Sequence, residues 1–157
     1  MATDGITSLV VNGATIEAVD RGKGRTILFL HPGIGIDPAA PVLAALARGG
    51  RVIAPSHPGF GASQLPKGMT TVDDLAYFYL DMIEQLDLRD VLVVGIGLGG
   101  WIAAEIAIKD QSRLSHLVMR RMNDCQSSDQ WVWPHRTSHL ADDARAAQDK
   151  PDCRRNQ

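Results

Sequence analysis

Short hydrophobic runs near the start of the chain are typical of β-strands. Residues 9–11 and 14–16 are two such runs, separated by Asn12 and Gly13, a pair that tolerates the positive φ angles of a type I′ turn. Residues 26–30 form an unbroken apolar run, as expected for a strand that is covered on both faces. The pattern therefore predicts a β-hairpin followed by a buried strand.

Later apolar residues recur at helical spacing. The pattern predicts helices over 37–48, 71–86 and 98–109. Asp37 is the expected N-cap of the first helix, with Pro38 in its first turn. Thr71 and Asp74 have the spacing of a capping box, which predicts the start of the second helix. The third helix is apolar on nearly every face.

Buried strands are expected between and after these helices, at residues 51–54, 91–94 and 114–119. Strands that alternate with helices are typical of parallel βαβ units, so the predicted fold class is α/β. Residues 55–68 contain three prolines and predict a loop. Residues 91–108 are apolar enough to resemble a membrane span, but their central glycines favour a strand, a turn and a helix.

Composition changes after Met119. All 15 glycines lie at or before Gly100. We therefore expect two parts: a truncated domain over residues 1–119, and a polar, disordered tail over 120–157 with a short helix at 141–148. Such a tail would leave strand 114–119 as an exposed sheet edge, which predicts self-association.

Chain length, net charge and cysteine spacing exclude several classes of function. A chain of 157 residues is the size of one domain, and its formal charge of −2 offers no basic field for nucleic acid. Cys125 and Cys153 lack metal-ligand spacing, so no metal site is predicted. The segment 1–8 has no signal-peptide pattern, which predicts a cytoplasmic protein without membrane contact.

The glycine-rich turn at residues 95–100 carries the most chemical information. Gly95 and Gly99 match the flanking glycines of a G-x-S-x-G nucleophile elbow, with Gly97 in the nucleophile position. Gly95, Gly97 and Gly100 also match the dinucleotide fingerprint G-x-G-x-x-G. Both motifs join a buried strand to a helix.

The position of this turn in the chain favours the elbow. A dinucleotide fingerprint normally follows the first strand of its sheet, whereas several strands precede this one. The acidic ribose ligand expected about 20 residues later is also replaced by Arg120 and Arg121. Since Arg120 could meet a 2′-phosphate, an NADP-binding Rossmann-like domain remains an alternative.

Four segments in order resemble the α/β-hydrolase family, in particular its ester, epoxide, carbon–halogen and carbon–carbon bond hydrolases. The segments are His31-Pro32-Gly33, residues 54–63, the elbow with the residues that follow it to 105, and residues 113–118. The resemblance covers residues from about 8 to 119. It implies a partial α/β-hydrolase sheet with small-molecule substrates and no cofactor.

The resemblance also implies roles for particular residues. Gly33 and Leu98 would donate the oxyanion-hole N–H groups, with Ile34 as a substitute for Gly33. The family's nucleophile position falls on Gly97, which has no attacking atom. The family places its catalytic acid and histidine after later strands, so no catalytic set is intact here.

The remaining motif residues are expected to shape turns. This group comprises His31, His57, Gly59, Gly61, Gly95, Gly99 and Gly100. Three functional hypotheses follow: a catalytically inactive member of the hydrolase family, a non-catalytic binding or scaffold pseudo-hydrolase, and the NADP-binding domain.

Overall fold

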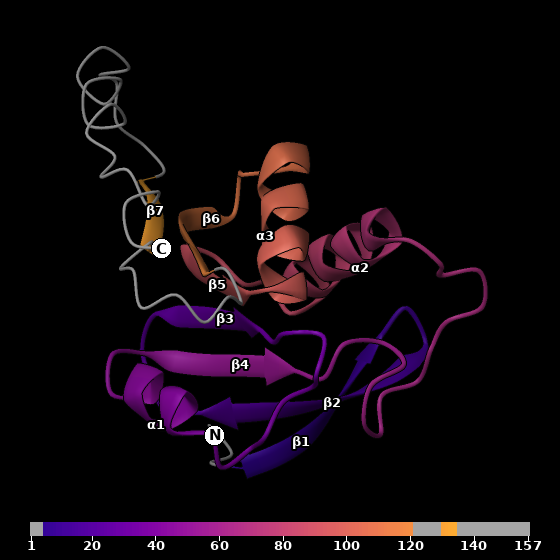
Figure 1. The fold of residues 1–157 in the computed structure, drawn as a ribbon, viewed down its shortest axis with the longest axis horizontal. Helices are drawn as coiled ribbons and strands as arrows, with labels where there is room; N and C mark the ends of the chain where they lie inside the picture. The colour runs from indigo at the N-terminus through magenta and orange to yellow at the C-terminus, as the bar shows by residue number, and fades with distance from the viewer. Residues whose placement is uncertain (1–4, 121–129, 135–157) are drawn as a thin grey trace, which may run out of the picture.

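The computed structural model describes residues 5–120 and 130–134, and it arranges them as one sheet with three helices (Figure 1). The strand order is β1-β2-β4-β3-β5-β6-β7. The strands are β1 (Gly5–Val11), β2 (Ala14–Arg21), β3 (Thr26–Leu30), β4 (Arg51–Pro55), β5 (Val91–Ile96), β6 (Leu114–Arg120) and β7 (Gln130–Pro134). The helices are α1 (Pro41–Ala47), α2 (Val72–Gln85) and α3 (Leu98–Lys109).

The chain opens with the predicted hairpin. β1 and β2 are antiparallel, with Val11 opposite Ala14. Asn12 and Gly13 have φ angles of 49° and 81°, as a type I′ turn requires. β2 then pairs antiparallel with β4, so the hairpin extends one side of the sheet.

The centre of the sheet is parallel, because β3 pairs in parallel with both β4 and β5, and β5 pairs in parallel with β6. These pairings confirm the predicted α/β class with a hairpin followed by βαβ units. The carboxyl ends of the parallel strands meet at one edge, which is where ligands bind in open α/β sheets.

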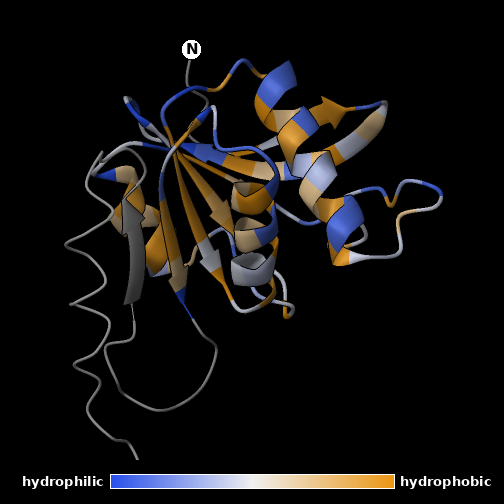
Figure 2. Cartoon of the chain, turned by 90° about the horizontal axis from the view of Figure 1, so that it is seen from above, coloured by the Kyte–Doolittle hydropathy of each residue, from blue (hydrophilic) through white to orange (hydrophobic). Residues whose placement is uncertain are grey.

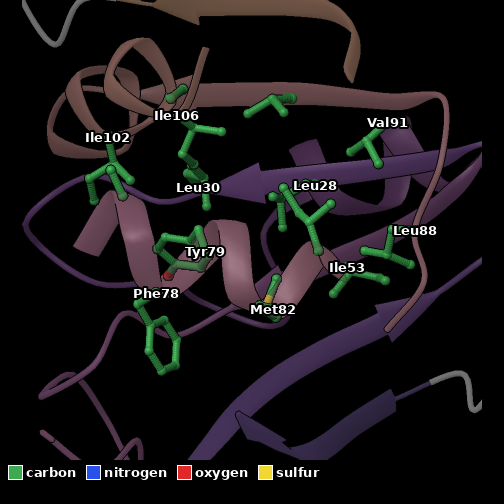
Figure 3. Packing of buried hydrophobic residues seen from close by; sticks show 14 of the residues in the cluster. Leu28, Leu30, Ile53, Phe78, Tyr79, Met82, Leu88, Val91, Ile102 and Ile106 are labelled. Atoms are coloured by element: carbon green, nitrogen blue, oxygen red, sulfur yellow. The ribbon is translucent and has the colours of Figure 1, made fainter. Parts of the chain in front are cut away.

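β3 shows why the central strands are apolar throughout. Ile27 and Phe29 pack in a cluster with Leu43 of α1, whereas Leu28 and Leu30 pack in the cluster that includes α2 and α3. Alternate residues therefore face opposite helix layers. Figure 2 shows the hydrophobic colouring of the central strands, and Figure 3 shows the α2 and α3 side of the core.

Two helix starts differ in how well they were predicted. α2 has the expected capping box, in which Thr71 Oγ1 accepts the Asp74 N–H and the Asp74 carboxylate accepts the Thr71 N–H. α1 begins at Pro41 with Ala40 as N-cap, so the prediction of Asp37 as N-cap is wrong. Asp37 instead forms a turn, with Oδ1 accepting the Ala39 N–H at 2.8 Å.

β6 is not the last strand or an outer strand of the described sheet. β7 pairs with it antiparallel, with Leu117 opposite Trp133. The expected open edge at residues 114–119 is therefore wrong, because the outer strands of the described sheet are β1 and β7. The short helix expected at 141–148 lies outside the described residues.

The apolar run 91–108 is divided as predicted. β5 ends at Ile96, Gly97 turns the chain, and α3 begins at Leu98. Within the described residues, no helix is both long and apolar enough to cross a membrane.

Candidate functional site: a glycine elbow at the carboxyl edge of the sheet

Gly97 forms the tip of the turn between β5 and α3. Its backbone has φ 56° and ψ −115°, a conformation that strains any residue with a Cβ. Its N–H donates to the Arg120 carbonyl at 2.9 Å, and its carbonyl accepts the Trp101 N–H at 3.1 Å. The tip is thus held by the end of β6 on one side and by the first turn of α3 on the other.

The flanking glycines are required by close backbone contact. A Cβ on Gly95 would lie 2.3 Å from the Gly99 carbonyl oxygen, and a Cβ on Gly99 would lie 2.0 Å from the Leu30 carbonyl oxygen. The Gly99 N–H donates to the His31 carbonyl at 3.1 Å. α3 therefore starts in direct backbone contact with the end of β3, which brings the segment after β3 beside the elbow.

Gly33 and Leu98 lie next to each other across this junction. A Cβ on Gly33 would lie 4.0 Å from Leu98 Cβ. Neither backbone N–H has a hydrogen-bond acceptor among the described residues. The side chain of Ile34 is 83% exposed, so this loop faces solvent. Two backbone N–H groups without acceptors in the described part of the chain therefore belong to residues near the tip of the elbow.

Both nitrogens of the His31 ring are occupied. Nδ1 donates to the Pro32 carbonyl at 2.6 Å, and Nε2 accepts the His57 N–H at 2.8 Å. The residue is fully buried, and burial lowers the pKa of its imidazole. His31 is therefore neutral near pH 7 and has no nitrogen left to act as a base.

His57 is occupied in the same way. Nε2 donates to the His31 carbonyl at 2.8 Å, and Nδ1 accepts the Tyr79 hydroxyl hydrogen at 2.5 Å. Burial, followed by the nearby His31 ring at 3.8 Å between centroids, lowers the pKa of His57 to about 3. Burial also raises the pKa of Tyr79 well above its usual range, so the hydroxyl keeps its proton.

The loop after β4 is tied to β2. Gly59 and Gly61 have φ angles of 85° and 54°, which place both in the left-handed region. Glu17 Oε2 accepts the Ala62 N–H at 3.0 Å, and Ser63 Oγ accepts the Glu17 N–H at 3.0 Å. Glu17, Ser63 and Tyr79 were not predicted as site residues, because the hydrogen-bond partner of each is 22 or more residues away in the sequence.

The predicted site residues fall into two groups in the structure. Gly33, Gly97 and Leu98 meet at the carboxyl edge of β3 and β5. His31 and His57 lie buried beneath this edge and are in contact with each other. Arg120, which the dinucleotide alternative requires, ends β6, and its carbonyl binds the Gly97 N–H.

Comparison with known proteins places this geometry in a family. Residues 25–150 match the alpha/beta hydrolase fold family. The chain is 34% identical over 100 residues to a putative carbamate hydrolase of Caulobacter segnis, covering 61% of this chain and 38% of that protein. It is 29% identical over 116 residues to a 2-hydroxymuconate semialdehyde hydrolase of a Pseudomonas strain, covering 71% of this chain and 41% of that protein.

Solved structures agree with the sequence match. Epoxide hydrolase CorEH aligns with a TM-score of 0.64 at 23% identity, covering 80% of this chain and 46% of that one. An epoxide hydrolase of Vigna radiata aligns with a TM-score of 0.62 at 22% identity, covering 73% and 38%. This chain thus spans less than half the length of these relatives. With its strand order, elbow and family match, the chain belongs to the α/β-hydrolase fold family.

Proposed function

We propose that this chain is an α/β-hydrolase-family protein without covalent hydrolytic activity. The observation that carries the proposal is Gly97 at the tip of the elbow, with φ 56° and ψ −115°. A covalent hydrolase needs an oxygen or sulfur at this point to attack the substrate, and glycine supplies none. Glycine also adopts this backbone conformation with little strain, so the turn persists without the nucleophile.

The function that this site supports is the binding of a small molecule. Gly33 and Leu98 lie next to each other, and their N–H groups have no acceptor among the described residues, which supports a role for both as oxyanion-hole donors. Ile34 would replace Gly33 as the donor if the loop shifted by one residue. Two such donors can hold a carboxylate or carbonyl oxygen even where no bond is broken.

The neighbouring residues are proposed to hold this arrangement in place. His31 and His57 connect the loops after β3 and β4 through neutral hydrogen bonds. Gly95, Gly99 and Gly100 let α3 approach β5 and β3, while Gly59 and Gly61 allow the turns after β4. None of these residues then takes part in a proton transfer.

An esterase assay tests the absence of covalent chemistry. We expect no hydrolysis of p-nitrophenyl acetate above background by the full chain or by Gly97→Ser, because a serine also needs a base to activate it. Turnover by the unmodified chain that Leu98→Pro abolishes and Leu98→Ala retains would overturn the proposal. Proline is tolerated in the first turn of a helix, so Leu98→Pro removes the N–H while leaving α3 able to form.

A titration with butyrate tests the binding role. We expect saturable changes in the amide NMR signals of Gly33 and Leu98. Leu98→Pro has no amide signal at residue 98, so in that variant we expect the change at Gly33 to be lost. Leu98→Ala keeps the N–H and is the matched control. Butyrate that shifts neither signal, or that binds both variants equally, would contradict a role for the two N–H groups.

A further inference from the structure

A cavity of about 560 Å³ lies between β2, the segment after β3 and the loop after β4. Its chemically informative lining residues are Glu17, Ile36, Asp37, Ser56 and Phe60. Ile34 lines it, but Gly33, Gly97 and Leu98 do not, so the inference drawn from this cavity does not rest on the two proposed N–H donors.

The charge of this cavity is negative. Glu17 and Asp37 are carboxylates from separate elements, and no Lys or Arg is among the lining residues. Glu17 uses Oε2 to accept the Ala62 N–H, and Asp37 uses Oδ1 to accept the Ala39 N–H. One carboxylate oxygen of each residue therefore has no partner in the described part of the chain. A site of this kind favours a cation.

Ser56 provides an independent sign that a ligand binds here. The residue is only 6% exposed, and its Oγ has no hydrogen-bond partner among the described residues. Its backbone is fully used, since the N–H donates to the Glu17 carbonyl and the carbonyl accepts the Ser63 hydroxyl. The residue lines the cavity, so this hydroxyl is accessible from the cavity and can donate to or accept from a ligand there.

The Glu17 and Ser56 oxygens lie on the same side of Gly61. A Cβ on Gly61 would lie 3.1 Å from Glu17 Oε2 and 3.6 Å from Ser56 Oγ. Because Gly61 has no side chain, it does not cover these two oxygens. A carboxylate and a hydroxyl oxygen that lie near each other are acceptors suited to an N–H donor.

The other wall of the cavity is apolar. Ile36 is partly buried and packs against the α1 side of the core, and Phe60 packs edge-on against His31 at 5.2 Å between ring centroids. An aromatic ring near carboxylates favours organic cations over bare metal ions. The ligand should therefore combine a positive nitrogen with a short hydrocarbon chain.

We infer that this cavity binds a small primary ammonium compound. Its N–H groups would donate to Glu17 and to Ser56 Oγ, and Asp37 would add negative charge at the rim. The hydrocarbon chain would contact Phe60 and Ile36. A quaternary ammonium has no N–H to donate and would bind more weakly.

Titration with n-butylammonium chloride, followed by amide NMR of the full chain at constant ionic strength, tests this inference. We expect saturable shifts around Ser56 and Gly61. Glu17→Gln should weaken binding about tenfold or more, because it removes the charge but keeps an oxygen that can accept the Ala62 N–H. Glu84→Gln, which removes an exposed carboxylate on α2, is the matched control and should leave the affinity unchanged.

Two further ligands and one further variant sharpen the result. n-Pentanol has a similar chain without the charge, and tetramethylammonium has the charge without the donors, so both should bind more weakly than n-butylammonium. Ser56→Ala should weaken n-butylammonium severalfold. The absence of saturable shifts, equal binding of n-pentanol, or unchanged affinity in Glu17→Gln would overturn the inference.

Discussion

The Nε2–H of His57 donates to the carbonyl oxygen of His31 at 2.8 Å, and the His57 N–H donates back to Nε2 of the His31 ring. The same His31 carbonyl accepts the Gly99 N–H at 3.1 Å. One oxygen atom therefore joins the loop after β4 to the first turn of α3. Neutral His57 therefore helps to hold the elbow in position through the His31 carbonyl.

We expect acid to weaken this fold. Both histidines have a folded-state pKa below the unfolded value of 6.5, and that of His57 is about 3. Below pH 6.5 the unfolded chain therefore binds more protons than the folded chain. The free energy of unfolding therefore keeps its full value above pH 6.5. Below pH 6.5, each fully linked histidine lowers the free energy of unfolding by about 1.4 kcal/mol per pH unit. Urea unfolding between pH 7.5 and pH 5 measures this slope.

The variant His57→Gln isolates the contribution of His57. Its side-chain amide can still donate to the His31 carbonyl but does not titrate, so the slope should become shallower. The carboxyl groups with lowered pKa, including Asp74 and Asp87, titrate below this pH range. An identical slope in wild type and variant would show that His57 is not the linked group.

Local signals explain which elements could be predicted. Asn12 and Gly13 define their turn by backbone preference alone, and Thr71 and Asp74 complete a capping box within one helical turn. The start of α1 was misplaced because Pro38 and Pro41 both suit a first helical turn, and Asp37 forms a turn outside the helix. The local sequence therefore did not determine which of the two prolines begins the helix.

Partners distant in sequence explain what was missed. Tyr79 lies within the helix predicted over 71–86, and no local pattern indicates that its hydroxyl binds His57. The salt bridge between Arg51 and Asp20 likewise joins β4 to β2 across 31 residues. Such contacts depend on strand order, in which β3 lies between β4 and β5, and no local pattern contains that order.

Gly99→Ala should destabilise the fold far more than Gly100→Ala. A Cβ at residue 99 would lie 2.0 Å from the Leu30 carbonyl oxygen, and backbone there cannot move without displacing β3. We expect a loss of about 3 kcal/mol or more. At Gly100 the nearest atom to a new Cβ is 3.4 Å away, and alanine favours a helix. Urea unfolding compares the two variants, and equal losses would contradict the predicted contact.

NADPH is expected to bind more weakly than a Kd of about 10 μM, or about −7 kcal/mol. The glycine turn follows β5, an internal strand, whereas a dinucleotide fingerprint follows the first strand of its sheet. Fluorescence titration measures the affinity, with Arg120→Ala as the variant that removes the candidate 2′-phosphate ligand. Tighter binding that Arg120→Ala abolishes would favour the dinucleotide-binding alternative.

β1 is an uncharged outer strand of the described sheet. The expectation of an open edge at β6 failed because β7 pairs there, whereas β1 pairs only with β2 in the described sheet. The seven residues of β1 carry no charge, and Ile6 and Val10 are 62% and 65% exposed.

We therefore expect the chain to self-associate through β1 at tens of micromolar, because an uncharged outer strand offers unpaired backbone groups to a second copy. Val10→Lys places a charge beside this edge and should shift the population toward monomer in sedimentation velocity. Ile108→Lys adds the same charge at a 77% exposed position on α3, away from the edge, and should have little effect. A wild-type chain that is already monomeric, or an equal response to both lysines, would show that β1 is not the associating surface.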